Sequence, residues 1–308
     1  MNSQKYVKEV ISCLELELNK SGSTLKGKPS MPMQANYHPE LDVSPLLDSD
    51  QANYYASHIG TLRWMVELGR IDIFINVSVL SSFLAQPRVC HMEQVLHIFA
   101  YLKHHEQTNL VFDPHFVDWD ESQFQTFDWT DFYKGASESV PPNAPEPWGN
   151  PVQMNVFVDA NHAGNRVTRR SHTGILLYLN STPIMWYNKA QSTVESSTFG
   201  SVAMRIAVDL IESVRYKLRM FGVPLQGTAN IFCYNKSVVT NSTVPTSTLK
   251  KKHDSIAYHR IREAVAAFLI CIAKVQSKEN LADLLTKPFS ASDLKHMVQR
   301  ILGSKLKL

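Results

Sequence analysis

Residues 153–161 read QMNVFVDAN, a short apolar run with one acid, Asp159, near its end. Two more apolar runs follow, GILLYLN at residues 174–180 and PIMWYNK at residues 183–189. Turn-forming segments separate the three runs, and each run has the length of a β-strand. This spacing predicts an antiparallel meander of three strands, with Asp159 on the first.

After the meander, helix and strand patterns alternate. Residues 201–222 carry apolar side chains at helical spacing and end at Gly222, a plausible stop, so they predict a long amphipathic helix. Two further strands are predicted over 229–234 (ANIFCY) and 268–275 (FLICIAKV), and two further helices over 254–267 and 279–289. The order predicts an α/β fold, a mixed five-stranded sheet flanked by helices.

The first 151 residues follow a different pattern. Val10, Cys13, Leu14 and Leu18 mark one face of a short amphipathic helix, and residues 51–105 have helical periodicity with breaks at Gly69 and Pro87. A smaller helical region therefore precedes the sheet. We predict five parts: an N-terminal helix and irregular segment (1–50), a helical connection-like region (51–112), an acidic proline-rich linker (113–151), the sheet domain (152–290) and a basic C-terminal helix or tail (291–308).

The net charge of +3 conceals a division between the halves. Residues 1–150 carry 10 Lys+Arg against 19 Asp+Glu, a balance of −9, and residues 151–308 carry 21 against 9, a balance of +12. Such a division predicts that the second half contacts a polyanion such as nucleic acid. A solvated basic surface without a partner is the alternative.

No stretch reaches the roughly 20 apolar residues that span a bilayer, and the N-terminus lacks the apolar block of a signal peptide. The four cysteines stand far apart without a CxxC pair, which favours free thiols in a reducing compartment. We therefore expect an intracellular protein, cytoplasmic or nuclear, without a membrane partner. The sequence does not indicate an oligomeric state.

Five local motifs resemble the ribonuclease H domain of copia-type retrotransposon polyproteins, in the order and at roughly the spacing of that family. They are FVDANHAGN (157–165), TRRSHTGILLYL (168–179), WYNKAQSTVESST (186–198), KKKHDSIAYHRIREAV (250–265) and NLADLLTKP (280–288). Residues 54–87 resemble the segment that joins the polymerase to that domain. The resemblance covers about residues 50–290 and implies a ribonuclease H-like fold.

In that family two divalent metals, roughly 3.5–4 Å apart, hydrolyse the RNA strand of an RNA–DNA hybrid, and four carboxylates hold them. The first and last carboxylates match Asp159 and Asp283. The third position, in a Cys-Asp-Asn sequence, is occupied here by Tyr234. The second should be a glutamate after Ser201, but Val202 follows directly, so the Glu and the aromatic residue next to it are missing.

Two of the four metal-binding acids are thus absent. A phenol with a reference pKa near 10 is a poor ligand for Mg²⁺ at neutral pH. We expect at most one weakly held Mg²⁺ or Mn²⁺, on Asp159 and Asp283. Glu195 or, less favourably, Asp209 would have to substitute if a two-metal centre survived.

Binding residues are implied at two basic clusters, which suit sequence-independent phosphate contacts. They are Arg166, Arg169 and Arg170 after the first strand, and Lys250, Lys251 and Lys252 before His253. His253 matches a flexible histidine of the family and is implied as an auxiliary residue for product release or proton transfer. His162, His104 and His105 are expected to be surface residues rather than ligands.

Three hypotheses follow. The first is a degenerate ribonuclease H-like domain that binds RNA–DNA hybrid or other nucleic acid but has lost two-metal hydrolysis. The second is an active Mg-dependent hybrid ribonuclease that uses a non-standard acid, and the third is a structural or interaction fragment without nucleic acid. No Asp-Asp pair occurs in the chain, so the polymerase motif Tyr-x-Asp-Asp is absent and no polymerase activity is expected.

Overall fold

The computed structural model of this protein describes residues 3–34, 36–106, 109–117, 120–161, 164–192, 199–248 and 255–302. Its contacts form two compact units. Unit 1 combines Met1–Val111, Ala163–Arg169 and Leu284–Ser304, and unit 2 combines Phe112–His162 with Arg170–Asp283. The five-part division predicted from the sequence stays a prediction that truncated fragments can test.

Unit 1 is helical, as the periodicity of residues 51–105 predicts. Its helices are α1 (Gln4–Lys20), α2 (Ser49–Glu67), α3 (Phe74–Ser81), α4 (Val89–His104) and α8 (Ala291–Leu302), with short 3₁₀ turns at Pro39–Leu41 and Ile71–Ile73. Asp48 caps α2, because its carboxylate accepts a hydrogen bond from Gln51 N–H at 2.9 Å and the Gln51 side-chain oxygen accepts one from Asp48 N–H at 3.3 Å. His104 and His105 are exposed, as expected.

The buried face of α1 differs from the predicted one. Val7, Ile11, Leu14 and Leu18 are buried, whereas Cys13 is exposed and Val10 is only partly covered. The buried set follows an i, i+4, i+7, i+11 stripe that the shorter pattern starting at Val10 missed.

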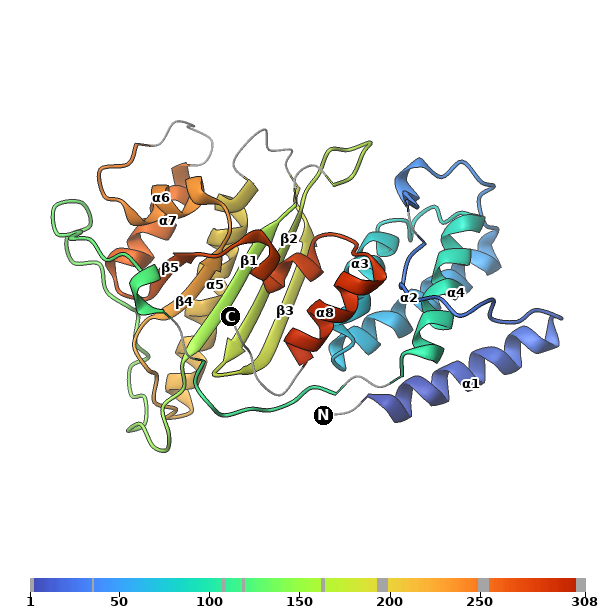
Figure 1. The fold of residues 1–308 in the computed structure, drawn as a ribbon, viewed down its shortest axis with the longest axis horizontal. Helices are drawn as coiled ribbons and strands as arrows, with labels where there is room; N and C mark the ends of the chain where they lie inside the picture. The colour runs from blue at the N-terminus through green and yellow to red at the C-terminus, as the bar shows by residue number, and fades with distance from the viewer. Residues whose placement is uncertain are drawn as a thin grey trace. The chain divides into compact units, whose positions relative to one another are not determined.

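Unit 2 contains one five-stranded sheet in the order β3-β2-β1-β4-β5 (Figure 1). The strands are β1 (Met154–Ala160), β2 (His172–Leu179), β3 (Thr182–Ala190), β4 (Ala229–Cys233) and β5 (Ile270–Lys274). The first three pair antiparallel, and β4 and β5 run parallel to β1. The predicted meander and the mixed ribonuclease H-like sheet are confirmed.

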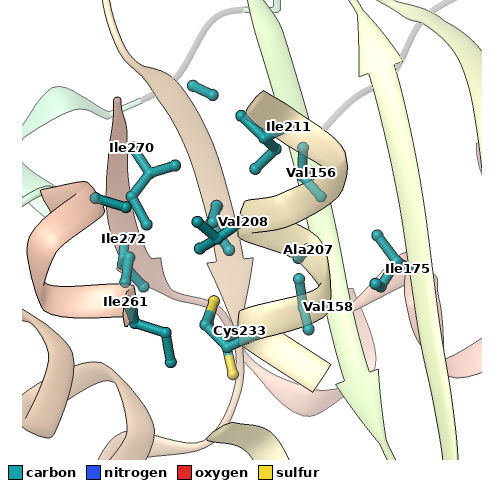
Figure 2. Packing of buried hydrophobic residues seen from close by; sticks show 14 of the residues in the cluster. Val156, Val158, Ile175, Ala207, Val208, Ile211, Cys233, Ile261, Ile270 and Ile272 are labelled. Carbon is teal, nitrogen blue, oxygen red and sulfur yellow. The ribbon is translucent and has the colours of Figure 1, made fainter. Parts of the chain in front are cut away.

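Helix α5 (Phe199–Met220) packs on β1 and β2 and on α7 (Ser255–Ala266). Its stripe Ala203, Ala207 and Ile211 is fully buried, as predicted, in a cluster with apolar side chains of four strands and α7 (Figure 2). The helix ends at Met220, two residues before Gly222, whose φ of +69° suits the left-handed turn that follows the helix.

Aromatic side chains occupy the other face of the sheet. Phe157 of β1 stacks on Phe232 of β4 with ring centroids 5.1 Å apart, and Phe124 meets Phe232 edge-on at 5.6 Å. Phe124 belongs to the acidic proline-rich segment, so that segment packs on the sheet of unit 2 in spite of its loop-like composition. We expect such aromatic pairs to add modestly to the burial energy.

Two elements differ from the sequence prediction. The helix expected over 279–289 is only a 3₁₀ turn, Leu281–Leu285, because Pro288 follows closely and four of the turn's five residues are apolar and buried. A short helix, α6 (Lys236–Thr243), follows β4 and was not assigned from the sequence. No helix within the described ranges is long and apolar enough to cross a membrane.

Candidate functional site

Asp159 lies near the carboxyl end of β1 and is almost fully buried, with 3% exposure. The residue before it, Val158, pairs with Cys233 of β4. Because these strands run parallel, their next residues, Asp159 and Tyr234, lie side by side at the carboxyl ends of the two strands.

Tyr234 is held in place by the start of α6. Asn235 caps this helix, since its side-chain oxygen accepts from Ser237 N–H at 3.0 Å and from Val238 N–H at 3.3 Å. Burial, followed by the negative charges of Asp159 and Asp283, raises the pKa of the Tyr234 phenol to about 12. The phenol is therefore neutral at physiological pH.

Asp283 reaches the same place from the 3₁₀ turn. Asn280, fully buried, donates from its side-chain amide to Val158 C=O at 3.0 Å and accepts from Ala282 N–H at 3.2 Å. This ties the turn that carries Asp283 to the end of β1. Asp283 itself is 4% exposed.

The first turn of α5 borders the site and contains no acidic residue. Gly200 of this turn lines a cavity of about 40 Å³ together with Asp159, Cys233 and Tyr234. A Cβ at Gly200 would lie 2.5 Å from Cγ2 of Val238, so only glycine fits so close to α6. Burial also raises the pKa of the Cys233 thiol, to about 12, so this thiol is protonated at neutral pH.

These residues do not fit a two-metal centre. Two carboxylates and a neutral phenol supply too little negative charge for two dications, and no group of three or more His, Cys, Asp or Glu side chains among the described residues could hold a metal ion. The cavity has room for one or a few water molecules.

The remaining predicted site residues divide into two groups. Arg166, Arg169 and Arg170 are exposed in the connection between β1 and β2, and Arg166 N–H bonds to the Glu40 carboxylate at 3.0 Å. Lys250, Lys251, Lys252 and His253, as well as Glu195 and His162, lie outside the described residues.

Asp209 does not reach the site. Its carboxylate forms ion pairs with Arg205 of the same helix at 3.4 Å and with Arg260 of α7 at 3.3 Å. Asn280, Asn235 and Gly200, which place the site residues, were not identified from the sequence. The sequence signals that could have found them are an Asn three residues before an acid for Asn280, a helix-capping residue after a strand for Asn235, and a glycine at a helix start for Gly200.

A search against models of known protein families gives no match. The retrovirus-related Pol polyprotein of transposon TNT 1-94 from Nicotiana tabacum is 25% identical over 294 residues, 93% of this chain. That of transposon RE1 from Arabidopsis thaliana is 24% identical over 249 residues, 80% of this chain. The homologues of this chain are retrovirus-related Pol polyproteins of plant transposons. The chain spans only 19% and 15% of the length of these two Pol homologues.

Two solved ribonuclease H structures are similar at low TM-scores. The N-terminal domain of a Mycobacterium tuberculosis protein gives 0.34 at 16% identity, covering 48% of this chain and 97% of that one. LC11-RNase H1, solved in complex with an RNA/DNA hybrid, gives 0.36 at 11% identity, covering 44% and 94%. The assignment of a ribonuclease H-like fold rests on the strand order and pairing in unit 2 and not on these two structures.

Proposed function

We propose that this chain is a degenerate ribonuclease H-like module of retrotransposon origin, which binds RNA–DNA hybrid or other nucleic acid but no longer catalyses efficient two-metal hydrolysis. The observation that carries the proposal is Tyr234, a neutral phenol beside two buried carboxylates.

The chemistry supports a lost activity. Two-metal hydrolysis needs one ion to activate water and another to stabilise the leaving oxygen, and several negative charges must offset their mutual repulsion. Asp159 and Asp283 supply two charges, Tyr234 none, and the first turn of α5 none. We infer one weakly held Mg²⁺ or Mn²⁺ at most.

Charge supports retained binding. The second half of the chain has a balance of +12, and Arg166, Arg169 and Arg170 are exposed. Together with Lys250, Lys251 and Lys252, they form the proposed phosphate contacts, with His253 as the proposed auxiliary residue.

Cleavage of a labelled RNA–DNA hybrid in Mg²⁺ or Mn²⁺ tests the lost activity. We expect no cleavage above background from the purified protein. Inserting Glu-Phe after Ser201 together with Tyr234→Asp is expected to restore it. Metal-dependent cleavage by the unaltered protein, abolished by Asp159→Asn, would contradict the proposal and favour an active nuclease. If the variant with both changes folds but does not cleave the hybrid, the loss of activity is not explained by these two positions.

Salt dependence tests the binding surface. We expect the logarithm of the binding constant for a hybrid to fall steeply with the logarithm of salt concentration, and Arg170→Gln to reduce the slope by about 1. Lys20→Gln, in the acidic half, is the matched control and should leave the slope unchanged. Absent or salt-independent binding would favour an interaction fragment without nucleic acid.

A further inference from the structure

A second and larger cavity lies in unit 2, at the edge strand β5. It has a volume of about 480 Å³, within the roughly 300–1,000 Å³ typical of ligand sites. The segment around residues 124–129 forms one wall, and β4, β5 and the end of α7 form the others. It shares no lining residue with the small cavity beside Asp159.

Among the described residues that line this edge cavity, none is an Asp, Glu, Lys, Arg or His. The lining is instead aromatic, aliphatic, amide and hydroxyl, with Trp129, Ile270 and Ile272 almost fully buried. A phosphate or carboxylate group would lose its hydration there without a counter-charge. The cavity therefore suits a neutral ligand.

Hydrogen bonds between neighbouring side chains fix the polar groups in the wall of the edge cavity. Asn230 donates from its side-chain amide to Asn155 Oδ1 at 2.9 Å and accepts from the Cys271 thiol at 3.0 Å. Thr228 Oγ1 lies 3.0 Å from the same sulfur. These contacts hold the polar side chains in one arrangement, which preorganises the wall for a ligand.

The backbone of β5 adds polar groups. Leu269 C=O accepts from Ala229 N–H at 3.0 Å, and Val275 N–H donates to Cys233 C=O at 3.1 Å, so the odd-numbered residues of this strand face β4. By the alternation of a parallel ladder, the N–H and C=O groups of Ile270 and Ile272 face away from β4, on the cavity side. An aliphatic ligand would leave these groups without partners.

Phe268 stands at the rim in an unfavourable backbone conformation. It occupies the C′ position of α7, where Phe268 N–H bonds to Val265 C=O and Leu269 N–H bonds to Ala264 C=O, at 3.1 and 3.0 Å. Its φ is +53°, a conformation that favours glycine, and the residue is 69% exposed. Burial thus does little to offset the strain. Phe127, 40% exposed, lines the same cavity.

We propose that the edge cavity binds a neutral, planar heteroaromatic ring of nucleobase size. The ring stacks on the rim phenyl of Phe268, while its polar edge bonds to the backbone groups of Ile270 and Ile272 and to the wall around Asn230. The ring belongs either to a free nucleoside or to an unpaired base of a single strand. This site does not depend on the proposed loss of hydrolysis.

Binding of uncharged adenosine to the full chain, measured by ligand-detected NMR and by calorimetry, tests the site. We expect saturable binding that Phe268→Gly weakens by roughly tenfold, because stacking on an aromatic side chain is lost. The same substitution should raise the Tm by roughly 2–4 °C, because glycine relieves the strain at the C′ position. Phe221→Gly is the matched control, since Phe221 is 80% exposed at the end of α5 and does not line the cavity. It should leave binding unchanged.

A comparison of a single-stranded oligoadenylate with adenosine distinguishes the two sources of the ring. If Phe268→Gly weakens the binding of either ligand, the result supports the site. Absence of binding by both at millimolar concentration overturns the proposal. So does equal weakening by Phe221→Gly. Naphthalene, a planar ring of similar size without hydrogen-bonding groups, would also overturn it by binding as tightly as adenosine, because the polar wall would then contribute nothing.

Discussion

Tyr234 keeps its proton because burial and two neighbouring carboxylates raise the pKa of its phenol to about 12. An unfolded tyrosine titrates near 10. Between about pH 10 and pH 12 the unfolded chain loses this proton while the folded chain keeps it, so the contribution of Tyr234 to stability is present below pH 10 and falls as the pH rises through that window. At neutral pH the residue is a space-filling, uncharged group.

Tyr234→Asp should convert the site into one that responds to metal. A third carboxylate beside Asp159 and Asp283 is expected to destabilise the metal-free protein by about 2 kcal/mol at pH 7, through like-charge repulsion and desolvation. Mn²⁺ should then raise the Tm of the variant in a thermal-shift titration. Tyr234→Asn is the uncharged control, and an equal Mn²⁺ shift in the unaltered protein would contradict this account.

Glu138 joins the acidic segment to α5. Its carboxylate accepts two hydrogen bonds from Arg215, at 2.7 and 2.9 Å, and one from Arg219 at 2.6 Å. Burial raises the pKa of this carboxyl, but the hydrogen bonds and charges of the two arginines outweigh it, and the net shift is downward. The stabilisation is therefore present above the unfolded pKa, near 4.3, and is lost as the pH falls through the folded value.

Glu138→Gln should lower the free energy of unfolding by about 3 kcal/mol at pH 7, because it leaves the buried guanidinium of Arg215 without its counter-charge. Urea denaturation at pH 7 and at pH 4 measures the effect. The difference between variant and unaltered protein should shrink at the lower pH. A difference that stays constant would show that the charge of Glu138 is not the cause.

At the scale of the element, the start of α5 is fixed by a close contact. Gly200 lies so near Val238 of α6 that any side chain must displace that valine. Farther along α5, Ala203, Ala207 and Ile211 are fully buried, so the helix keeps its apolar face where the resemblance indicates two missing residues. Residues 193–198, which precede α5, lie outside the described residues.

Gly200→Ala should destabilise the protein by roughly 1–2 kcal/mol, although alanine is the better helix former, because overpacking outweighs helix propensity. Chemical denaturation of the single variant, of Val238→Ala and of the double variant forms a double-mutant cycle. The cavity left by Val238→Ala should accommodate the new methyl group, so the double variant should be more stable than the sum of the two changes predicts. Strict additivity would contradict the contact.

At the scale of the whole molecule, the acidic proline-rich segment contacts the helices and strands of unit 2 through several side chains. Trp129 of this segment is 6% exposed, and the Arg262 guanidinium lies 4.7 Å from the centroid of its ring. Tyr133 Oη lies 2.7 Å from His259 Nδ1 of α7. These contacts join the segment to the domain whose limits were predicted at 152–290.

A fragment of residues 112–290 should therefore be more stable than a fragment of residues 152–290. The shorter fragment loses Glu138, Trp129 and Phe124 and exposes the side chains that they cover. We expect a difference in Tm of several degrees and stronger binding of a hydrophobic dye by the shorter fragment. Equal stability would show that the segment is only a linker.

The sequence by itself determined the strands and most of the helices, because alternation and helical spacing are local patterns that can be read directly from the amino-acid order. It also indicated Asp159, Tyr234 and Asp283 as candidate site residues, and their roles stay predictions. It did not identify α6 or the 3₁₀ turn at Leu281–Leu285, where the local pattern was too short. The predicted basic cluster at Lys250–Lys252 stays a prediction.

Only the tertiary structure decided which distant residues meet. Asn280 bonds to Val158 across 122 positions of the chain, and Glu138 bonds to Arg215 across 77. The edge cavity exists because residues 124–129 lie against β5, and the raised pKa of Tyr234 depends on two carboxylates from other elements. No periodicity encodes such contacts, since they depend on how separate faces pack once the sheet has formed.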